Sequence, residues 1–221
     1  GTAAAFAEAA RDASAVRDID AAASDLEGYL FPETYLLPRE TTAARLVALM
    51  AGRFRQLFAP EMRQAAEALG LTTRQAVTLA SLVEKETAVP AERPVVAAVY
   101  LNRLKIGMGM QADPTVIYAL ERAGRYDGNL RRDDLAFNSP YNTYRYAGLP
   151  PGPIASPGLA SLEATVSPAE VDYLYFVSRN DGSHVFARTL AEHNDNVRRY
   201  QVVYFREQRA ARRAAEKAGR P

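Results

Sequence analysis

The sequence predicts an α+β fold that is mainly helical, with one small antiparallel β-hairpin and long loops rich in proline, glycine and tyrosine. Apolar residues recur at helical spacing along residues 42–120, which predicts several consecutive helices. Residues 173–187 contain two short apolar runs around an Asn-Asp-Gly turn, which is typical of a β-hairpin. With 221 residues, of which 48% are hydrophobic and 24% charged, the chain can form a core without disulfides or metal ions.

The chain is predicted to have three parts: an N-terminal helical segment (residues 1–26), a main domain (27–205) and a basic C-terminal helix or tail (206–221). Alanine dominates residues 3–26, which favours a helix there. In residues 28–38, aromatic residues surround two prolines, a composition that indicates extended or turning chain. We expect these aromatic side chains either to line a groove or to pack against the core.

Helical periodicity predicts five helices in the first half of the main domain: residues 42–58, 60–69, 72–87, 93–104 and 113–120. Gly70 suits the position that follows a helix end. Thr72 and Gln75 form a capping-box pattern at the start of the third helix, and Pro94 suits the first turn of the fourth. Asp113 is a candidate cap for the fifth helix.

The second half of the main domain has a different pattern. Residues 139–161 are dense in proline, glycine, tyrosine and asparagine, which predicts a long ordered loop, and such loops are usually functional. A strand over residues 173–177 and a returning strand over 184–187 follow. The last helix begins near Thr189 and becomes strongly basic, as expected of a solvated helix or of a surface that meets nucleic acid, anionic lipid or protein.

Composition excludes several classes of function. The chain has no cysteine, which excludes thiol nucleophiles, disulfides and cysteine-ligated metals. Its two histidines, His184 and His193, are too far apart for an H-x-x-x-H metal site, so we expect neither a metal nor another cofactor. A net charge of +1 gives no general attraction to nucleic acid. The sequence contains no phosphate-binding glycine loop, no G-x-S-x-G motif and no apolar run long enough for a membrane span.

Glu86 is the residue whose position in its helix is most informative. The helical wheel places it on an apolar stripe with Leu79 and Leu82, whereas Glu84 lies at the margin of that stripe. Apolar surroundings disfavour the charged form of a carboxyl group and raise its pKa, as a general acid near neutral pH requires. The alternative is an ion pair with Arg93 or Arg103, and periodicity alone favours that structural interpretation.

Nine sequence blocks resemble the MltG (YceG-like) family of endolytic murein transglycosylases. They are GYLFPETY (28–35), LASLVEKETA (79–88), ER (92–93), YLNRL (100–104), MQADPTVIY (110–118), SPYNTY (139–144), GLPPGPIASPG (148–158), YLYFV (173–177) and HN (193–194). The blocks follow the order that they have in that family, and the resemblance covers about residues 27–200. Blocks this long and numerous are highly specific.

The resemblance implies a mainly helical, lysozyme-like catalytic domain in which the second glutamate of the E-K-E-T block, Glu86, is the single acid and base. Such an enzyme cleaves the bond between N-acetylmuramic acid (MurNAc) and N-acetylglucosamine (GlcNAc) in peptidoglycan and leaves 1,6-anhydro-MurNAc ends, which terminates nascent strands. The matching blocks supply candidate substrate-binding residues: Gln111, Asp113, Tyr141, Asn142, Tyr144, His193 and Asn194. Each also has a structural interpretation, such as helix capping for Asp113 or bonding within its own loop for Asn142.

Members of this family usually carry an N-terminal membrane span and a small LysM-like domain, which this sequence does not contain. The resemblance therefore implies a single-pass anchored protein whose catalytic domain lies on the extracytoplasmic, periplasmic face of the cytoplasmic membrane. Its implied partners are the peptidoglycan glycan strand and the peptidoglycan synthases, and no nucleic acid. The alternatives are an inactive peptidoglycan-binding or scaffold module, a hydrolytic muramidase, and a nucleic-acid binder that uses the basic C-terminal helix.

Overall fold

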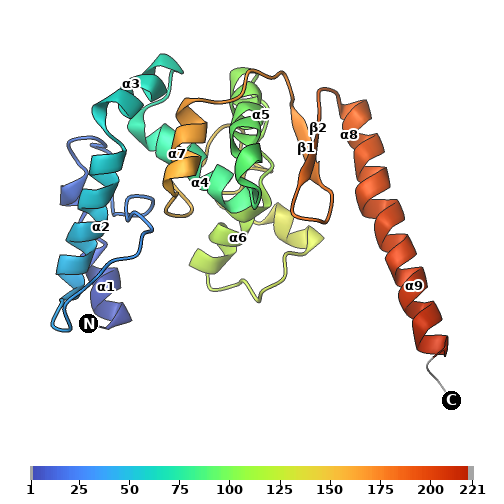
Figure 1. The fold of residues 1–221 in the computed structure, drawn as a ribbon, viewed down its shortest axis with the longest axis horizontal. Helices are drawn as coiled ribbons and strands as arrows, with labels where there is room; N and C mark the ends of the chain where they lie inside the picture. Colours follow the sequence, from blue (N-terminus) through green and yellow to red (C-terminus); the bar gives the residue numbers. More distant parts are fainter. Residues whose placement is uncertain (1, 219–221) are drawn as a thin grey trace.

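Helices α4 (Thr73–Glu86), α5 (Arg93–Lys105) and α7 (Leu159–Val166) pack against one another at the centre of the computed structural model (Figure 1). The structure describes residues 2–218, and side chains as far as Arg212. Every residue of α4 from Ala76 to Val83 is buried. The middle of α4 is therefore covered on all sides, and its C-terminal residue, Glu86, reaches a surface pocket.

The predicted helices of the first half are confirmed. They are α2 (Ala43–Leu57), α3 (Pro60–Ala68), α4, α5 and α6 (Asp113–Arg122). The capping box of α4 is formed in both directions, with Gln75 N–H donating to Thr72 Oγ1 at 3.2 Å and Thr72 N–H donating to Gln75 Oε1 at 2.9 Å. Gly70 has a φ of +76°, as its place after a helix end predicts.

The N-terminal segment is less helical than predicted. Helix α1 (Ala3–Ala9) ends early, and only a short 3₁₀ turn (Ala13–Ala15) follows before α2. Three aspartates explain the difference, because Asp12, Asp20 and Asp25 each accept a hydrogen bond from the backbone N–H two residues further on, at 2.9–3.1 Å. Such side-chain bonds compete with helical hydrogen bonds and favour turns.

The aromatic segment 28–38 packs into the core at its start and emerges at its end. Tyr29 is only 1% exposed and contacts Phe54 edge to face at 5.1 Å, whereas Leu36 is 97% exposed. Gly28 makes the entry possible, because its φ is +85° and a Cβ atom there would lie 2.4 Å from Pro153. Tyr29 therefore packs in the core, which is one of the two expected outcomes.

The long Pro/Gly/Tyr-rich loop is present but shorter than predicted, since α7 begins at Leu159. Two 3₁₀ helices, Pro90–Glu92 and Arg132–Ala136, were also not predicted. The hairpin is confirmed as strands β1 (Tyr175–Ser178) and β2 (His184–Ala187), which pair antiparallel with Phe176 opposite Phe186. The hairpin lies between α5 and α8, which places it beside the end of α4 (Figure 1).

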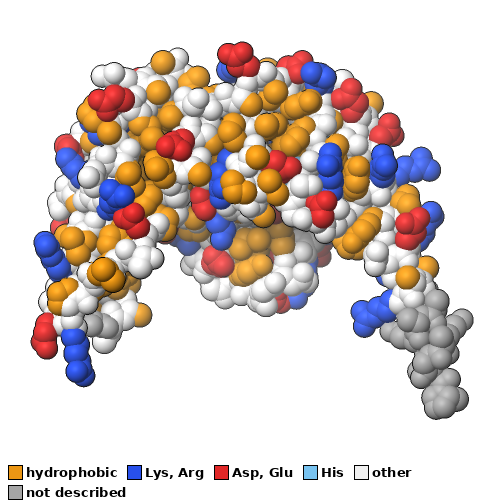
Figure 2. Space-filling model, in the orientation of Figure 1, with side chains coloured by type: hydrophobic (Ala, Val, Ile, Leu, Met, Phe, Trp, Pro, Cys, Tyr) orange, Lys and Arg blue, Asp and Glu red, His pale blue; other side chains and the backbone are white. Residues whose placement is uncertain are grey.

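The C-terminal helices form one rod that leads away from the body of the molecule (Figure 1). Helix α8 (Leu190–Val197) starts at a capping box of Thr189 and Glu192, and a π-helical stretch (Arg198–Val203) joins it to α9 (Tyr204–Ala218). The side chains of Arg213, Lys217 and Arg220, which belong to the predicted basic tail, lie outside the described residues. Acidic and basic side chains are interspersed on the face that Figure 2 shows. Within residues 2–218, no helix has the length and apolar composition of a membrane span.

Candidate active site

Glu86 is the last residue of α4, and it lines a pocket of about 300 Å³. Helix α5 contributes Arg103 to this pocket, and the chain around the start of α6 contributes Gln111 and Asp113. The long loop, the hairpin and α8 complete the lining: Tyr144, Phe176, Val177, Ser178, His184 and His193. Residues that are distant in the sequence thus surround one half-buried carboxyl group.

The surroundings of Glu86 favour its protonated form. Burial raises the pKa of the carboxyl group to about 7, with a further upward contribution from the negative charge of Asp113. The Tyr100 hydroxyl and the positive charge of Arg103 act in the opposite direction but do not cancel the rise. The C-terminal end of a helix also disfavours a negative charge. A pKa near the working pH is what an acid that gives and regains a proton needs.

The two arginines that could have neutralised Glu86 have other partners. Arg103 is buried and donates to the carbonyl oxygens of Leu174 and Met110, at 2.6 and 2.5 Å. Arg93 donates to Ser161 and lies 3.9 Å from Glu84. Among the residues that the structure describes, Glu86 forms no ion pair. The ion-pair interpretation that periodicity favoured is therefore wrong for Glu86.

Glu84 has the structural position instead. Its Oε2 accepts hydrogen bonds from the Gly158 N–H at 3.1 Å and from the Ser161 hydroxyl at 2.6 Å. These bonds tie α4 to the first turn of α7, and Glu84 does not line the Glu86 pocket. Of the two glutamates in the E-K-E-T block, only Glu86 presents its carboxyl group to the pocket.

Asp113 and Tyr144 form a polar pair on the pocket wall. The Tyr144 hydroxyl donates to Asp113 Oδ1 at 2.6 Å. Asp113 makes no capping hydrogen bond to α6, so the capping interpretation of this residue is wrong. Gln111, next to this pair, has a φ of +50°, an unusual backbone conformation for a residue other than glycine. Thr143 supports that conformation, because its carbonyl oxygen and hydroxyl accept from the N–H groups of Gln111 and Ala112 at 3.2 and 3.0 Å.

Three predicted substrate-binding residues do not reach the pocket. Asn142 is fully buried, and its side chain bonds within its own loop to the carbonyl oxygens of Leu135 and Phe137. The Tyr141 ring packs against Tyr118 at 4.9 Å and faces a separate hollow. Asn194 is exposed on α8 and does not line the pocket. For Asn142 the structural alternative is correct, because its amide hydrogen-bonds to its own loop and not toward the pocket.

Several pocket residues were not predicted from the sequence. His184 and the three residues from β1 form one wall, and the buried Tyr100 hydroxyl lies beside Glu86. His193, which was predicted, lines the same pocket, and its ring stacks on Tyr175 at 5.1 Å. The alternating aromatic residues of the hairpin indicated a strand but could not show which face it presents to Glu86.

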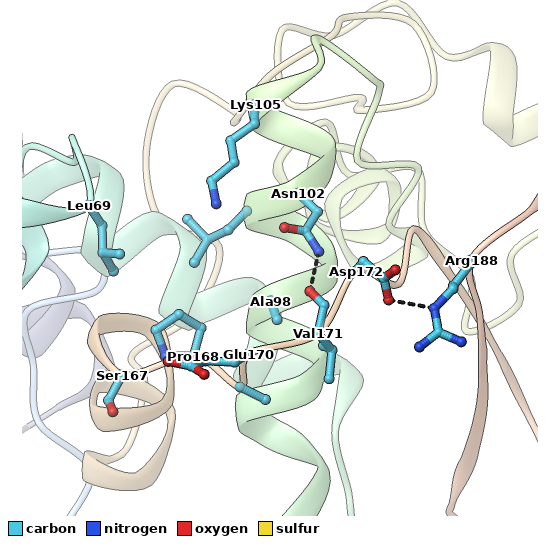
Figure 3. Close-up of a pocket in the computed structure, with 12 residues that line it drawn as sticks. Leu69, Ala98, Asn102, Lys105, Ser167, Pro168, Glu170, Val171, Asp172 and Arg188 are labelled. Atoms are coloured by element: carbon cyan, nitrogen blue, oxygen red, sulfur yellow. Dashed lines mark hydrogen bonds and ion pairs between the residues drawn. The ribbon is translucent and has the colours of Figure 1, made fainter.

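A larger hollow of about 650 Å³ lies on another face of α5 (Figure 3). It shares no lining residue with the Glu86 pocket among the described residues. Figure 3 shows that its polar groups are partly engaged with one another, since Arg188 pairs with Asp172 at 2.5 Å and Asn102 donates to Val171 at 2.8 Å. Among the described residues that line it, this hollow contains no carboxyl group whose pKa is raised as that of Glu86 is.

The residues that the structure describes include no cluster of histidine, cysteine, aspartate and glutamate suited to a metal ion.

Comparison with known proteins places the sequence in a family. The model of the YceG-like family matches residues 2–199. An endolytic murein transglycosylase from Bacillus subtilis is 40% identical over 179 residues, and one from Streptococcus pneumoniae is 36% identical over 176 residues. These alignments cover 79% and 78% of this chain but 48% and 32% of the relatives. The chain thus spans half or less of the length of these curated relatives.

A solved structure has the same fold. The crystal structure of a YceG-like protein from Listeria monocytogenes superposes with a TM-score of 0.77 at 33% sequence identity. The superposition covers 88% of this chain and 67% of that chain. The family match, the sequence identities and the shared fold agree, and the chain belongs to the YceG-like family.

Proposed function

We propose that this chain is the catalytic domain of a lytic transglycosylase that cleaves the MurNAc–GlcNAc bond of peptidoglycan. The observation that carries the proposal is the environment of Glu86, a carboxyl group that burial keeps protonated near neutral pH at an accessible pocket. The names of the Bacillus and Streptococcus relatives, both endolytic murein transglycosylases, give the substrate class. The polar and aromatic pocket lining suits a sugar, whose hydroxyl and acetamido groups need hydrogen bonds.

The proposed reaction uses Glu86 twice. Protonated Glu86 gives its proton to the glycosidic oxygen, the bond from this oxygen to C1 of MurNAc breaks, and C1 becomes oxocarbenium-like. The Glu86 carboxylate then takes the proton of the C6 hydroxyl as O6 bonds to C1 and closes the 1,6-anhydro ring. No water is consumed, and Glu86 ends the cycle protonated. A carboxyl group whose pKa is near 7 suits both steps.

Asp113 gives the pocket a second carboxyl group, which the sequence analysis had not paired with Glu86. In the proposed mechanism Asp113 does not attack the sugar, because the C6 hydroxyl of MurNAc is the nucleophile. The negative charge of Asp113 instead raises the pKa of Glu86. A hydrolytic muramidase is the competing reaction, because a second carboxylate could activate water. The two reactions differ in product, since hydrolysis leaves a reducing end in place of the anhydro ring.

The first test compares two glutamate variants. Purified peptidoglycan is digested with the wild type, E86Q and E84Q, and the products are analysed by mass spectrometry. We expect anhydro-MurNAc ends from the wild type, a loss of at least about 10³-fold with E86Q, and a much smaller loss with E84Q. Circular dichroism checks that E86Q is folded.

Each other outcome has a defined meaning. Reducing ends in place of anhydro ends identify a muramidase, and binding without cleavage by the wild type identifies a binding or scaffold module. Equal losses in E86Q and E84Q contradict the assignment of Glu86, because Glu84 does not line the pocket.

The cellular role follows from the same proposal. A domain that acts on murein works outside the cytoplasm, and we infer that the protein is anchored in the cytoplasmic membrane with this domain on the outer face. Peptidoglycan synthases are the proposed partners, and termination of nascent glycan strands is the proposed role. Co-purification of the full-length protein with cross-linked synthases tests the partnership.

A further inference from the structure

His184 and Glu92 form a carboxylate–imidazole pair at the wall of the Glu86 pocket. The His184 Nδ1 lies 2.8 Å from Glu92 Oε2, and the backbone N–H of His184 donates to Glu92 Oε1 at 3.0 Å. The two side chains are only 10% and 16% exposed. Glu92 ends the 3₁₀ turn before α5, and His184 begins β2. The pair therefore joins the hairpin to the start of α5, where it also fixes the orientation of the imidazole ring.

The contact with Glu92 determines which nitrogen of the ring carries hydrogen. A carboxylate accepts but does not donate, so Nδ1 is the donor, and in the neutral ring Nε2 is an acceptor. Nε2 has no hydrogen-bond partner within the described side chains, and it is not among their buried unpaired atoms. It is thus accessible. Phe176 packs edge-on against the ring at 5.3 Å and limits its rotation.

The same pocket contains a further unsatisfied polar atom. Among the described side chains, the buried Nδ1 of His193 lacks a hydrogen-bond partner, and His193 lines the pocket. Buried polar atoms are rarely left unpaired, so this atom indicates a place where a ligand supplies a hydrogen bond.

We propose that His184 is a further substrate-contacting residue, whose Nε2 accepts a hydrogen bond from a sugar hydroxyl, and that Glu92 is the residue that positions it. The proposal rests on the proposed function, because it takes the ligand to be a glycan. Sugar hydroxyls are donors that need acceptors in a pocket. Asp113 has one oxygen occupied by Tyr144, whereas the Nε2 of His184 is uncommitted.

The competing interpretation is that the pair only fastens the hairpin, and two amide substitutions separate these roles. In H184N the amide replaces Nδ1 and can still donate to Glu92, but nothing remains at the position of Nε2. In H184Q the amide reaches the position of Nε2 and loses the short contact with Glu92. A fastening role makes H184Q the more damaging change, whereas a substrate contact makes H184N the more damaging change for cleavage.

Cleavage of purified glycan strands and thermal unfolding are measured for both variants and for E92Q. We expect H184N to unfold within about 2 °C of the wild type and to lose about tenfold in kcat/KM, as for one hydrogen bond to substrate. We expect H184Q to keep a higher kcat/KM than H184N but to unfold at a lower Tm than H184N. E92Q places an NH₂ group opposite Nδ1 and favours the other tautomer, so it also lowers kcat/KM, and its effect is not additive with that of H184N.

A nitrogen NMR measurement on the wild type gives a readout that does not depend on the variants or on turnover. We expect the Nδ1–H tautomer for His184 and a shift of its Nε2 resonance on addition of chitotriose. Wild-type cleavage by H184N, or an Nε2 resonance that chitotriose does not move, overturns the proposal. If the wild type leaves peptidoglycan intact, the proposed function fails, and the NMR titration still decides whether His184 contacts a sugar.

Discussion

Glu84 and Glu86, only two residues apart at the end of α4, have different surroundings. Glu84 is held by a backbone N–H and a serine hydroxyl, whereas Glu86 has neither and lies in a pocket with Asp113. Hydrogen bonds stabilise a carboxylate, and burial with a nearby negative charge destabilises it. The different surroundings of the two side chains thus favour a structural role for Glu84 and the proposed role of acid for Glu86.

Asp113 is expected to control the pH range of the reaction. Activity needs protonated Glu86, so it falls as the pH rises through the pKa of about 7. Replacing Asp113 with asparagine removes a negative charge that raises this pKa, and the alkaline limb of the kcat/KM profile then moves to lower pH. Tyr100, Arg103, His184 and His193, which also surround Glu86, are unchanged in D113N.

The matched control for this prediction is Y144F. This change removes the hydroxyl that donates to Asp113 but keeps the negative charge near Glu86. We expect Y144F to lower the rate at all pH values without moving the alkaline limb. An unmoved limb in D113N, measured over pH 5–9 (a window of roughly two units on either side of the pKa), contradicts the proposed role of Asp113.

The sequence identified Glu86 as the candidate acid but predicted only part of its surroundings. Glu86 could be identified because a carboxyl group on an apolar helical stripe is unusual and because it falls in the E-K-E-T block. The sequence could not show whether the Asn142 amide binds a sugar or its own loop, because an amide suits both. In the structure it donates to two carbonyl oxygens of its own loop. His184 was difficult to assign because its partner, Glu92, lies far away in the sequence.

At the scale of elements, local signals predicted helices well where capping and periodicity agreed. The capping box predicted at Thr72 and Gln75 correctly gave the start of α4. Helix α7 was missed because Gly158 offers no side-chain cap and the helix follows a stretch dense in proline and glycine. Its stability comes from packing on α4 and α5, and that contribution cannot be seen in a short sequence window.

Replacing Gly28 with alanine tests how the N-terminal segment is joined to the rest of the fold. In G28A the methyl group meets Pro153, which lies 2.4 Å from the position of a Cβ atom, in a backbone conformation with φ at +85°. We expect a loss of about 2 kcal/mol or more in the free energy of unfolding, or roughly 4–8 °C in Tm. Chemical denaturation measures the loss.

Gly52 in α2 provides the control, because a Cβ atom there contacts nothing within 4 Å. G52A is expected to be neutral or stabilising by up to about 1 kcal/mol, since alanine favours a helix. Equal stability of G28A and the wild type contradicts the described packing of residues 28–31 against the loop that contains Pro153.

At the scale of the whole molecule, the pocket exists because separate elements meet at the end of α4. Helix α5, the start of α6, the long loop, the hairpin and α8 each contribute to its lining. Local sequence patterns predicted these elements one by one, but the directions in which they pack depend on contacts between distant residues. The resemblance to a known family supplied what periodicity could not, namely that residues from several distant blocks, among them Glu86, Asp113, Tyr144 and His193, lie around one pocket.

The central claim is that Glu86 keeps its proton near neutral pH in an accessible pocket. A carbon NMR titration of the Glu86 carboxyl group in the wild type, assigned by comparison with E86Q, measures this directly. The account predicts a pKa of about 7, well above the ordinary 4.5 of a glutamate. A titration midpoint near 4.5 would contradict it, because Glu86 would then be a carboxylate at the pH at which it has to donate a proton.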